Sequence, residues 1–150
     1  MLQISKRVSA LSPSATLAML QKTNELKAAG VDVIGLTAGE PDFNTPDHIK
    51  EAAKKAIDEN YSRYTPVSGY LSLRKAICDK LQRENGLTFT PDQIVVGNGA
   101  KHALCNVIMA TVDPGDEVII PTPAWVSYIE MVKLAEGKPV TCLLYTSPSP

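Results

Sequence analysis

A glycine-rich turn at residues 97–101 is the first place where this sequence could do chemistry. The turn reads GNGAK and lies between a short apolar run at 94–96 and an apolar-periodic segment that continues to Thr111. Small residues let backbone N–H groups converge at a helix N-terminus, where the positive end of the helix dipole favours an anion. The local sequence therefore predicts either a phosphate site or an ordinary strand-to-helix turn, and it leaves both open.

Two better-known phosphate motifs do not fit this turn. The dinucleotide-binding fingerprint G-x-G-x-x-G needs a third glycine where His102 stands, and it needs an acid at the end of the next strand. Asp113 and Asp116 instead precede that strand. A P-loop would need Gly-Lys followed by Ser or Thr, which the sequence lacks here.

Three further residues could contact a ligand, and each has a plainer interpretation. Trp125 follows the apolar run at 118–121, and residues just beyond the carboxyl ends of parallel strands line ligand crevices. It could stack on a planar cofactor, or it could be a core or interface tryptophan. Gly39 could let a ligand carboxylate approach the backbone, or it could belong to a simple turn. Tyr64 could donate its phenolic hydroxyl, or it could be a half-buried loop residue.

Helical and strand-like segments alternate along the chain and must position these residues. Capping residues, glycine terminators and apolar spacing predict helices at 14–30, from Thr45 as N-cap to about 59, and at 71–84, 101–111 and 125–135. Short apolar runs predict strands at 31–36, 94–96, 118–121 and 140–144, and 90–93 is expected to be a capped turn. From residue 91 onward the order is β-α-β-α-β, which is typical of a parallel sheet covered by helices.

Composition narrows the class of protein. With 150 residues, 44% of them apolar, and a formal net charge of −1, the chain suits one globular domain or a piece of one. The balanced charge favours neither nucleic acid nor an anionic membrane as a partner, and no apolar run is long enough to span a bilayer. The three cysteines and two histidines lack metal-ligand spacing, so we expect no metal site, reduced thiols and a cytoplasmic location.

Four stretches taken together resemble a known family. They are LKAAGVDVIGLTAGEPDFNTPDHIKEAAKKAI, RYTPVSGYLSLRKAI, VVGNGAKHAL and DPGDEVIIPTPAWVSY. In order and spacing they resemble class I aminotransferases of the bacterial aspartate aminotransferase type, over residues 5–142. The resemblance implies the N-terminal part of an α/β fold-type I transferase dependent on pyridoxal 5′-phosphate. Residues 1–13 would be an arm, 14–45 part of a small domain, 46–142 the start of the large domain, and 143–150 a non-native tail.

The resemblance also implies roles for the candidate residues. The N–H groups of Ala100 and Lys101, after Gly99, would hold the cofactor phosphate. Trp125 would stack on the pyridine ring and help to orient the substrate carboxylate, which Gly39 would contact through its backbone. Tyr64 would reach the phosphate bound to the neighbouring subunit, which implies a homodimer.

The function implied is transfer of an α-amino group from an amino acid to a 2-oxo acid. Lys101 is not the lysine that binds the cofactor covalently in this family, and we expect that lysine and the substrate arginines beyond residue 150. The 150 residues alone should therefore be inactive. There are two alternatives. The chain could belong to a β-lyase or synthase of the same fold, or it could be a non-catalytic interaction module. The sequence departs from the family at three positions. Ser12 stands where some relatives carry a Lys. His102 replaces a common Gln, and Ala124 replaces a common Tyr.

Overall fold

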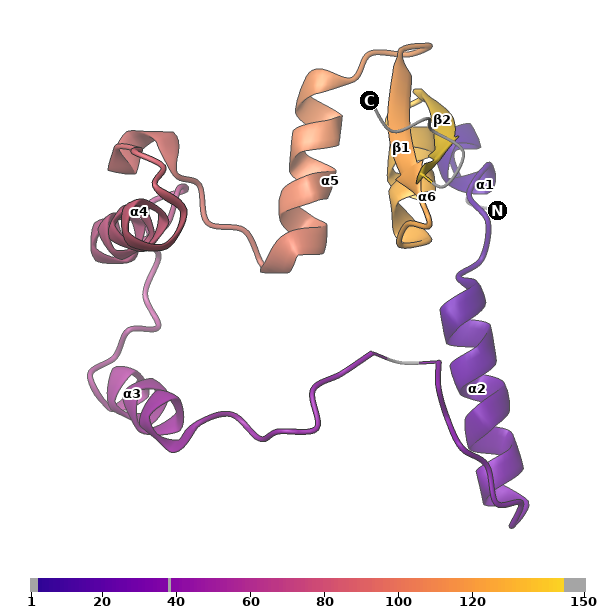
Figure 1. Ribbon diagram of the computed structural model, residues 1–150, viewed down its shortest axis with the longest axis horizontal. Coiled ribbons are helices and arrows are strands. Elements are labelled where there is room, and N and C mark those ends of the chain that lie inside the picture. The colour runs from indigo at the N-terminus through magenta and orange to yellow at the C-terminus, as the bar shows by residue number, and fades with distance from the viewer. Residues whose placement is uncertain (1–2, 38, 145–150) are drawn as a thin grey trace. The chain divides into compact units, whose positions relative to one another are not determined.

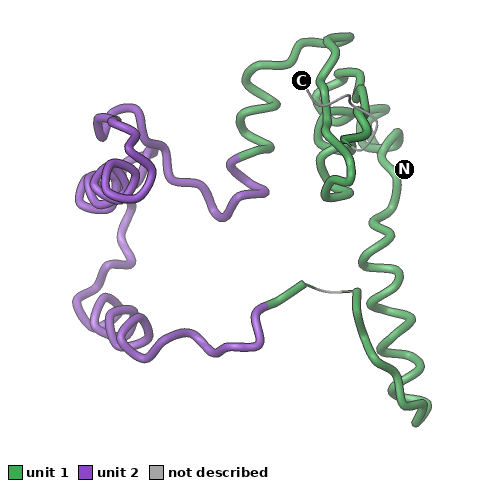
Figure 2. The backbone as a smooth tube through the Cα atoms, in the orientation of Figure 1, with its two compact units in different colours: residues 1–40, 104–150 green, residues 41–103 purple. Residues whose placement is uncertain are grey.

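The computed structural model describes residues 3–37 and 39–144, which form two compact units (Figures 1 and 2). Unit 1 combines Met1–Glu40 with Leu104–Pro150, and unit 2 is Pro41–Ala103. The domain boundaries expected at residues 13, 45 and 142 stay a prediction.

Unit 1 contains a parallel β-α-β unit. Strand β1 (Glu117–Thr122) leads into helix α6 (Ser127–Leu134), and strand β2 (Lys138–Leu143) returns beside β1. The two strands pair in parallel, in register from Glu117 opposite Lys138 to Thr122 opposite Leu143. The Thr122 hydroxyl donates a hydrogen bond of 3.1 Å to the Cys142 carbonyl and ties the strand ends together. The predicted strand–helix–strand pattern is confirmed over this stretch.

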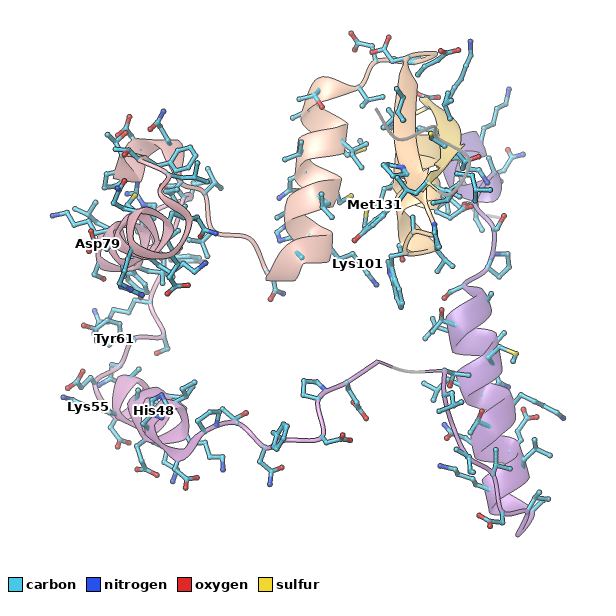
Figure 3. All side chains as sticks on the ribbon, in the orientation of Figure 1. His48, Lys55, Tyr61, Asp79, Lys101 and Met131 are labelled. Carbon is cyan, nitrogen blue, oxygen red and sulfur yellow. The ribbon has the colours of Figure 1, made fainter. Side chains whose placement is uncertain are left out.

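The core of unit 1 is small and lies between β1 and α6. Among the residues that the structure describes, the buried hydrophobic ones are Ile120, Met131, Val132 and Ala135. Figure 3 labels Met131 among the side chains of this region. Ile119, on the opposite face of β1 from Ile120, is 70% exposed. Parallel strands normally have both faces covered, so one face of this sheet is left without a packing partner.

Helix α2 (Ala15–Ala28) follows the short helix α1 (Lys6–Ser9) in unit 1. The Ser14 hydroxyl accepts a hydrogen bond from the Leu17 N–H, which satisfies one of the unpaired donors of the first turn. Gly30, at φ +80°, follows the helix in the left-handed conformation that glycine tolerates best. The helix predicted at 14–30 is confirmed, because both of its end signals are local.

Unit 2 consists of helices α3 (Asp47–Asp58) and α4 (Leu71–Asn85), the 3₁₀ turn η1 (Pro91–Gln93) and the first residues of α5 (Gly99–Thr111). Gly86 ends α4 at φ +67°, and Thr90 and Gln93 form a reciprocal capping box around η1. These features were predicted. Thr45 is not the N-cap of α3, however. Pro46 holds that position, because its carbonyl accepts the first helical bonds, from Ile49 and Lys50.

Two predicted strands were wrong, and two helix starts differ from the predicted ones. Residues 31–36 and 94–96 are extended or irregular but form no strand. Helix α5 begins at Gly99 rather than 101, and α6 begins at Ser127 rather than 125. Within the described ranges the one sheet is the β1–β2 pair, so these apolar runs have no ladder to join. The Val96 N–H instead donates a single bond of 3.1 Å to the Ser68 carbonyl. In residues 3–37 and 39–144, no helix is long and apolar enough to cross a membrane.

Candidate functional site

The glycine-rich turn leads into helix α5, as predicted, but the helix begins at Gly99 rather than at Lys101. Gly99 opens the helix at φ +82°, and no atom lies within 4 Å of the point where a Cβ would stand. Gly97 is different, because a Cβ there would lie 3.3 Å from the Cβ of Ala103. Gly97 thus allows close packing of the turn on its own helix. Gly99 supplies a left-handed bend at the start of the helix, a backbone conformation that glycine adopts without strain.

Two backbone donors of the turn are used within the turn itself. The Asn98 N–H donates to the Nδ1 atom of His102 at 2.9 Å, and the Gly99 N–H donates to the Gly97 carbonyl at 3.0 Å. The next N–H groups along the chain belong to Ala100 and Lys101, in the first turn of α5. Figure 3 labels Lys101 at this end of the helix. That these two groups bind a phosphate stays a prediction.

His102 is a residue whose role was missed. From the sequence, it excludes the dinucleotide fingerprint and departs from a glutamine that is common in the family. In the structure its ring accepts the Asn98 N–H from four residues away, so it acts as a local cap for the turn. The spacing of the two residues along one helical turn was the available signal.

Tyr64 lies in the loop between α3 and α4 and its side chain is fully exposed. The far end of this loop is anchored by Arg74, whose Nε donates to the Gly69 carbonyl at 3.2 Å and whose Nη1 donates to the Pro91 carbonyl at 2.6 Å. The Ser68 carbonyl accepts the Val96 N–H, just before the turn. Unit 2 therefore links the Tyr64 loop to the segment that leads into the Gly99 turn.

Arg74 was not singled out from the sequence, although it stands in the recognisable stretch RYTPVSGYLSLRKAI. Its planar guanidinium donates hydrogen bonds to two backbone carbonyls, one 5 residues before it in the sequence and one 17 residues after it. Gly69 has φ +93°, and a Cβ there would stand 3.0 Å from the Val96 side chain. Gly69, at the end of the Tyr64 loop, is thus packed tightly against Val96, in the segment that precedes the glycine-rich turn.

Trp125 and Gly39 belong to unit 1. Trp125 lies beyond the carboxyl end of β1, its carbonyl accepts the Tyr128 N–H at 3.1 Å, and its side chain is 45% exposed. Gly39 lies in exposed coil, and no atom lies within 4 Å of the point where a Cβ would stand. The turn residues and Tyr64 are in unit 2, so the grouping of all six residues into one site stays a prediction.

The side chains that commonly bind metal ions are scattered in the part of the chain that the structure describes. No cluster of three or more His, Cys, Asp or Glu side chains there could hold a metal ion. Cys78, Cys105 and Cys142 are free thiols.

The sequence matches characterised proteins closely. The profile of the family Aminotransferase class I and II matches residues 31–149. The chain is 56% identical over 138 residues to an aspartate/prephenate aminotransferase of Cereibacter sphaeroides, covering 92% of this chain and 34% of that protein. It is 55% identical over 139 residues to the aspartate aminotransferase of Bacillus subtilis, covering 93% of this chain and 35% of that one.

Solved structures agree with the sequence matches. The aspartate aminotransferase of Thermus thermophilus with maleate superposes with a TM-score of 0.89 at 50% identity, over 94% of this chain and 37% of that chain. A second aspartate aminotransferase, from Rhizobium meliloti, gives a TM-score of 0.89 at 48% identity, over 95% of this chain and 36% of that chain. The fold is therefore part of the α/β aminotransferase fold, with parallel strands and helices as predicted.

The chain spans about a third of the length of the curated relatives that it matches. The family profile nevertheless covers well over half of the chain, and the identity extends over almost all of it. Members of this family use pyridoxal 5′-phosphate. The chain belongs to the class I and II aminotransferase family and is of the aspartate aminotransferase type.

Proposed function

We propose that this chain is part of an aminotransferase that moves an amino group from an aspartate-type amino acid to a 2-oxo acid. The observation that carries the proposal is the 55% identity to the Bacillus subtilis aspartate aminotransferase over 93% of the chain. The structural likeness to the Thermus thermophilus enzyme, solved with maleate, supports the same substrate class. Maleate is a four-carbon dicarboxylate, as aspartate is.

The Gly99 turn fits the phosphate of pyridoxal 5′-phosphate. Gly99 bends the chain directly into the N-terminus of α5, and the positive end of a helix dipole favours a dianion. We infer that Ala100 and Lys101 bind the phosphate through their backbone N–H groups. When bound, the cofactor supplies the electron sink that lets the Cα–H bond of an amino acid break.

The other candidate residues have binding and orienting roles in this proposal. Trp125 holds the ring from one face, and Gly39 accepts the close approach of the substrate α-carboxylate. Tyr64, fully exposed on its loop, donates its hydroxyl to the phosphate of a neighbouring subunit. The proposal therefore includes a homodimer with shared sites. A cytoplasmic location is supported by the three free thiols.

The lysine that moves the proton at Cα is not Lys101, because the family resemblance places that lysine much later in the chain. We expect the proton-transferring lysine in the roughly two thirds of the family length that this chain does not span. The 150 residues should accordingly show no turnover by themselves.

The proposal is tested in a protein that carries this chain and continues to the full family length. Purified with pyridoxal 5′-phosphate, it should convert aspartate and 2-oxoglutarate to oxaloacetate and glutamate. Ammonia is measured in a parallel reaction that contains aspartate but no 2-oxo acid. Release of ammonia in the parallel reaction, together with no glutamate in the first reaction, would contradict the proposal and favour a lyase.

His102 should affect cofactor affinity through the shape of the turn. His102→Ala removes the acceptor of the Asn98 N–H, and a hydrogen bond of this kind contributes about 1 kcal/mol, or roughly fivefold in affinity. We expect the Kd for pyridoxal 5′-phosphate to rise about fivefold, measured by the absorbance of the bound cofactor. His102→Gln keeps an acceptor within reach and should change the Kd less. Equal affinity in all three proteins would contradict the capping role.

A further inference from the structure

The arm that precedes α2 is held to a distant helix by one carboxylate. The Ser12 N–H donates a hydrogen bond of 2.9 Å to the Oε2 atom of Glu130, which lies 118 residues later in α6. Both residues belong to unit 1, and α1 contacts α6 within it (Figure 1). Among the described residues, the other hydrogen bonds of residues 3–14 join positions no more than four apart. Glu130 is thus the polar anchor of the arm.

Glu130 is itself held in place by a second partner. Its Oε1 atom lies 2.8 Å from the Nζ atom of Lys133, with side chains 25% and 35% exposed respectively. The pair Glu51–Lys54 in α3 has the same spacing, at 2.7 Å, but its side chains are 69% and 66% exposed. The Lys133 ammonium first, and the Ser12 N–H second, hold the pKa of Glu130 below its usual range. The carboxylate therefore stays charged and oriented toward the arm near neutral pH.

The anchored arm forms one wall of a pocket of about 510 Å³. Residues 11–15 line one side, α6 lines another, and Thr122 at the end of β1 completes the lining with Ala124 and Val126. Ala124 and Val126 are the two chain neighbours of Trp125. The lining is mostly apolar, and Glu130 is the charged residue in it. The pocket therefore adjoins the segment that carries the proposed ring-stacking residue.

We propose that Glu130 is a positioning residue that latches the arm over this pocket, so that residues 11–15 close one side of the space beside Trp125. The role of the pocket rests on the proposed aminotransferase function, whereas the latch itself does not. Release of the latch removes the long-range hydrogen bond that ties the arm to α6. A substrate must then order the arm when it binds, which lowers its apparent affinity.

The first test is limited proteolysis of the full-family-length protein with cofactor bound. Trypsin can cleave after Arg7 in helix α1, and we expect faster cleavage when the arm opens, because cleavage reports the open population when opening is fast. A hydrogen bond to a charged acceptor is strong enough that Glu130→Ala should speed this cleavage about tenfold. Mass spectrometry of the new N-terminus at Val8 gives the rate.

Three variants serve as controls for the proteolysis. Glu51→Ala removes an equivalent intrahelical ion pair with no long-range contact, and should leave the cleavage rate at the parent value. Ser12→Ala keeps the backbone N–H and should also match the parent. Glu130→Gln keeps an acceptor and should give an intermediate rate. Equal cleavage of Glu130→Ala and Glu51→Ala would overturn the latch, provided that circular dichroism shows both to be folded.

The second test separates a positioning role from a general loss of stability. In steady-state kinetics with aspartate, Glu130→Ala should raise KM about tenfold and change kcat less than about twofold, because the loss falls on substrate binding. A fall in kcat of about tenfold with an unchanged KM would overturn the proposal. If the parent protein shows no transamination at all, the aminotransferase assignment fails, and the proteolysis still decides whether the latch exists.

Discussion

Replacing Trp125 by alanine should lower kcat/KM for transamination about ten- to hundredfold in the full-family-length protein. The side chain lies just beyond the carboxyl end of β1, is only half-buried, and does not belong to the core formed by Ile120 and Val132. Its proposed role is to stack on the cofactor ring, and a loss of roughly 1.4 to 2.8 kcal/mol of transition-state stabilisation corresponds to that range. Initial rates with aspartate and 2-oxoglutarate measure the effect.

A matched control separates ring stacking from packing. Trp125→Phe keeps an aromatic face and should retain most of the activity, whereas both variants should unfold within a few degrees of the parent protein. Unchanged kinetics for Trp125→Ala would refute the stacking role. A large fall in Tm for both variants would instead assign the residue to structure.

Replacing Gly137 by alanine should destabilise unit 1 by about 1 to 3 kcal/mol, the usual cost of overpacking a filled site. A Cβ at this position would lie 2.7 Å from Val112 Cγ1, 3.1 Å from Val132 Cγ1 and 3.2 Å from the Asp116 carbonyl oxygen. Val132 is 1% exposed and has no room to move away. Urea denaturation of the full-family-length protein, followed by fluorescence, gives the change in the free energy of unfolding.

The control for Gly137 is another glycine of unit 1. Gly35→Ala would bring its Cβ no closer than 3.5 Å to the Thr23 side chain, which is an ordinary contact, so its effect should be within about 0.5 kcal/mol. If both variants unfold at the same urea concentration as the parent, the tight approach at Gly137 carries no energetic weight and the prediction is wrong.

Signals that act within one or two turns of chain were sufficient to predict much of the fold. Ser14 and Gly30 mark the ends of α2, Gly86 ends α4, and Thr90 with Gln93 closes η1. In each case the hydrogen bond or positive φ involves residues no more than a few positions apart. Such interactions form wherever the local sequence permits them, so they can be inferred from the pattern of residues.

The two wrongly predicted strands show where local reasoning fails. The apolar runs at 31–36 and 94–96 look like strands, but a strand exists only through hydrogen bonds to a neighbouring strand. Val96 finds one such bond, to Ser68, and the run goes no further. Ile119 and Val107 are exposed for a related reason, since burial of an apolar side chain needs a second surface to pack against.

By itself, the sequence determined the family, the ends of α2, the C-terminal end of α4 and the glycine-rich turn, because these depend on residue identity and on neighbours along the chain. Only the tertiary structure decided that Arg74 joins Gly69 to Pro91, and that Glu130 holds Ser12 across 118 residues. The physical reason is that a long-range hydrogen bond depends on where folding brings distant backbone groups. No pattern in either segment specifies that meeting.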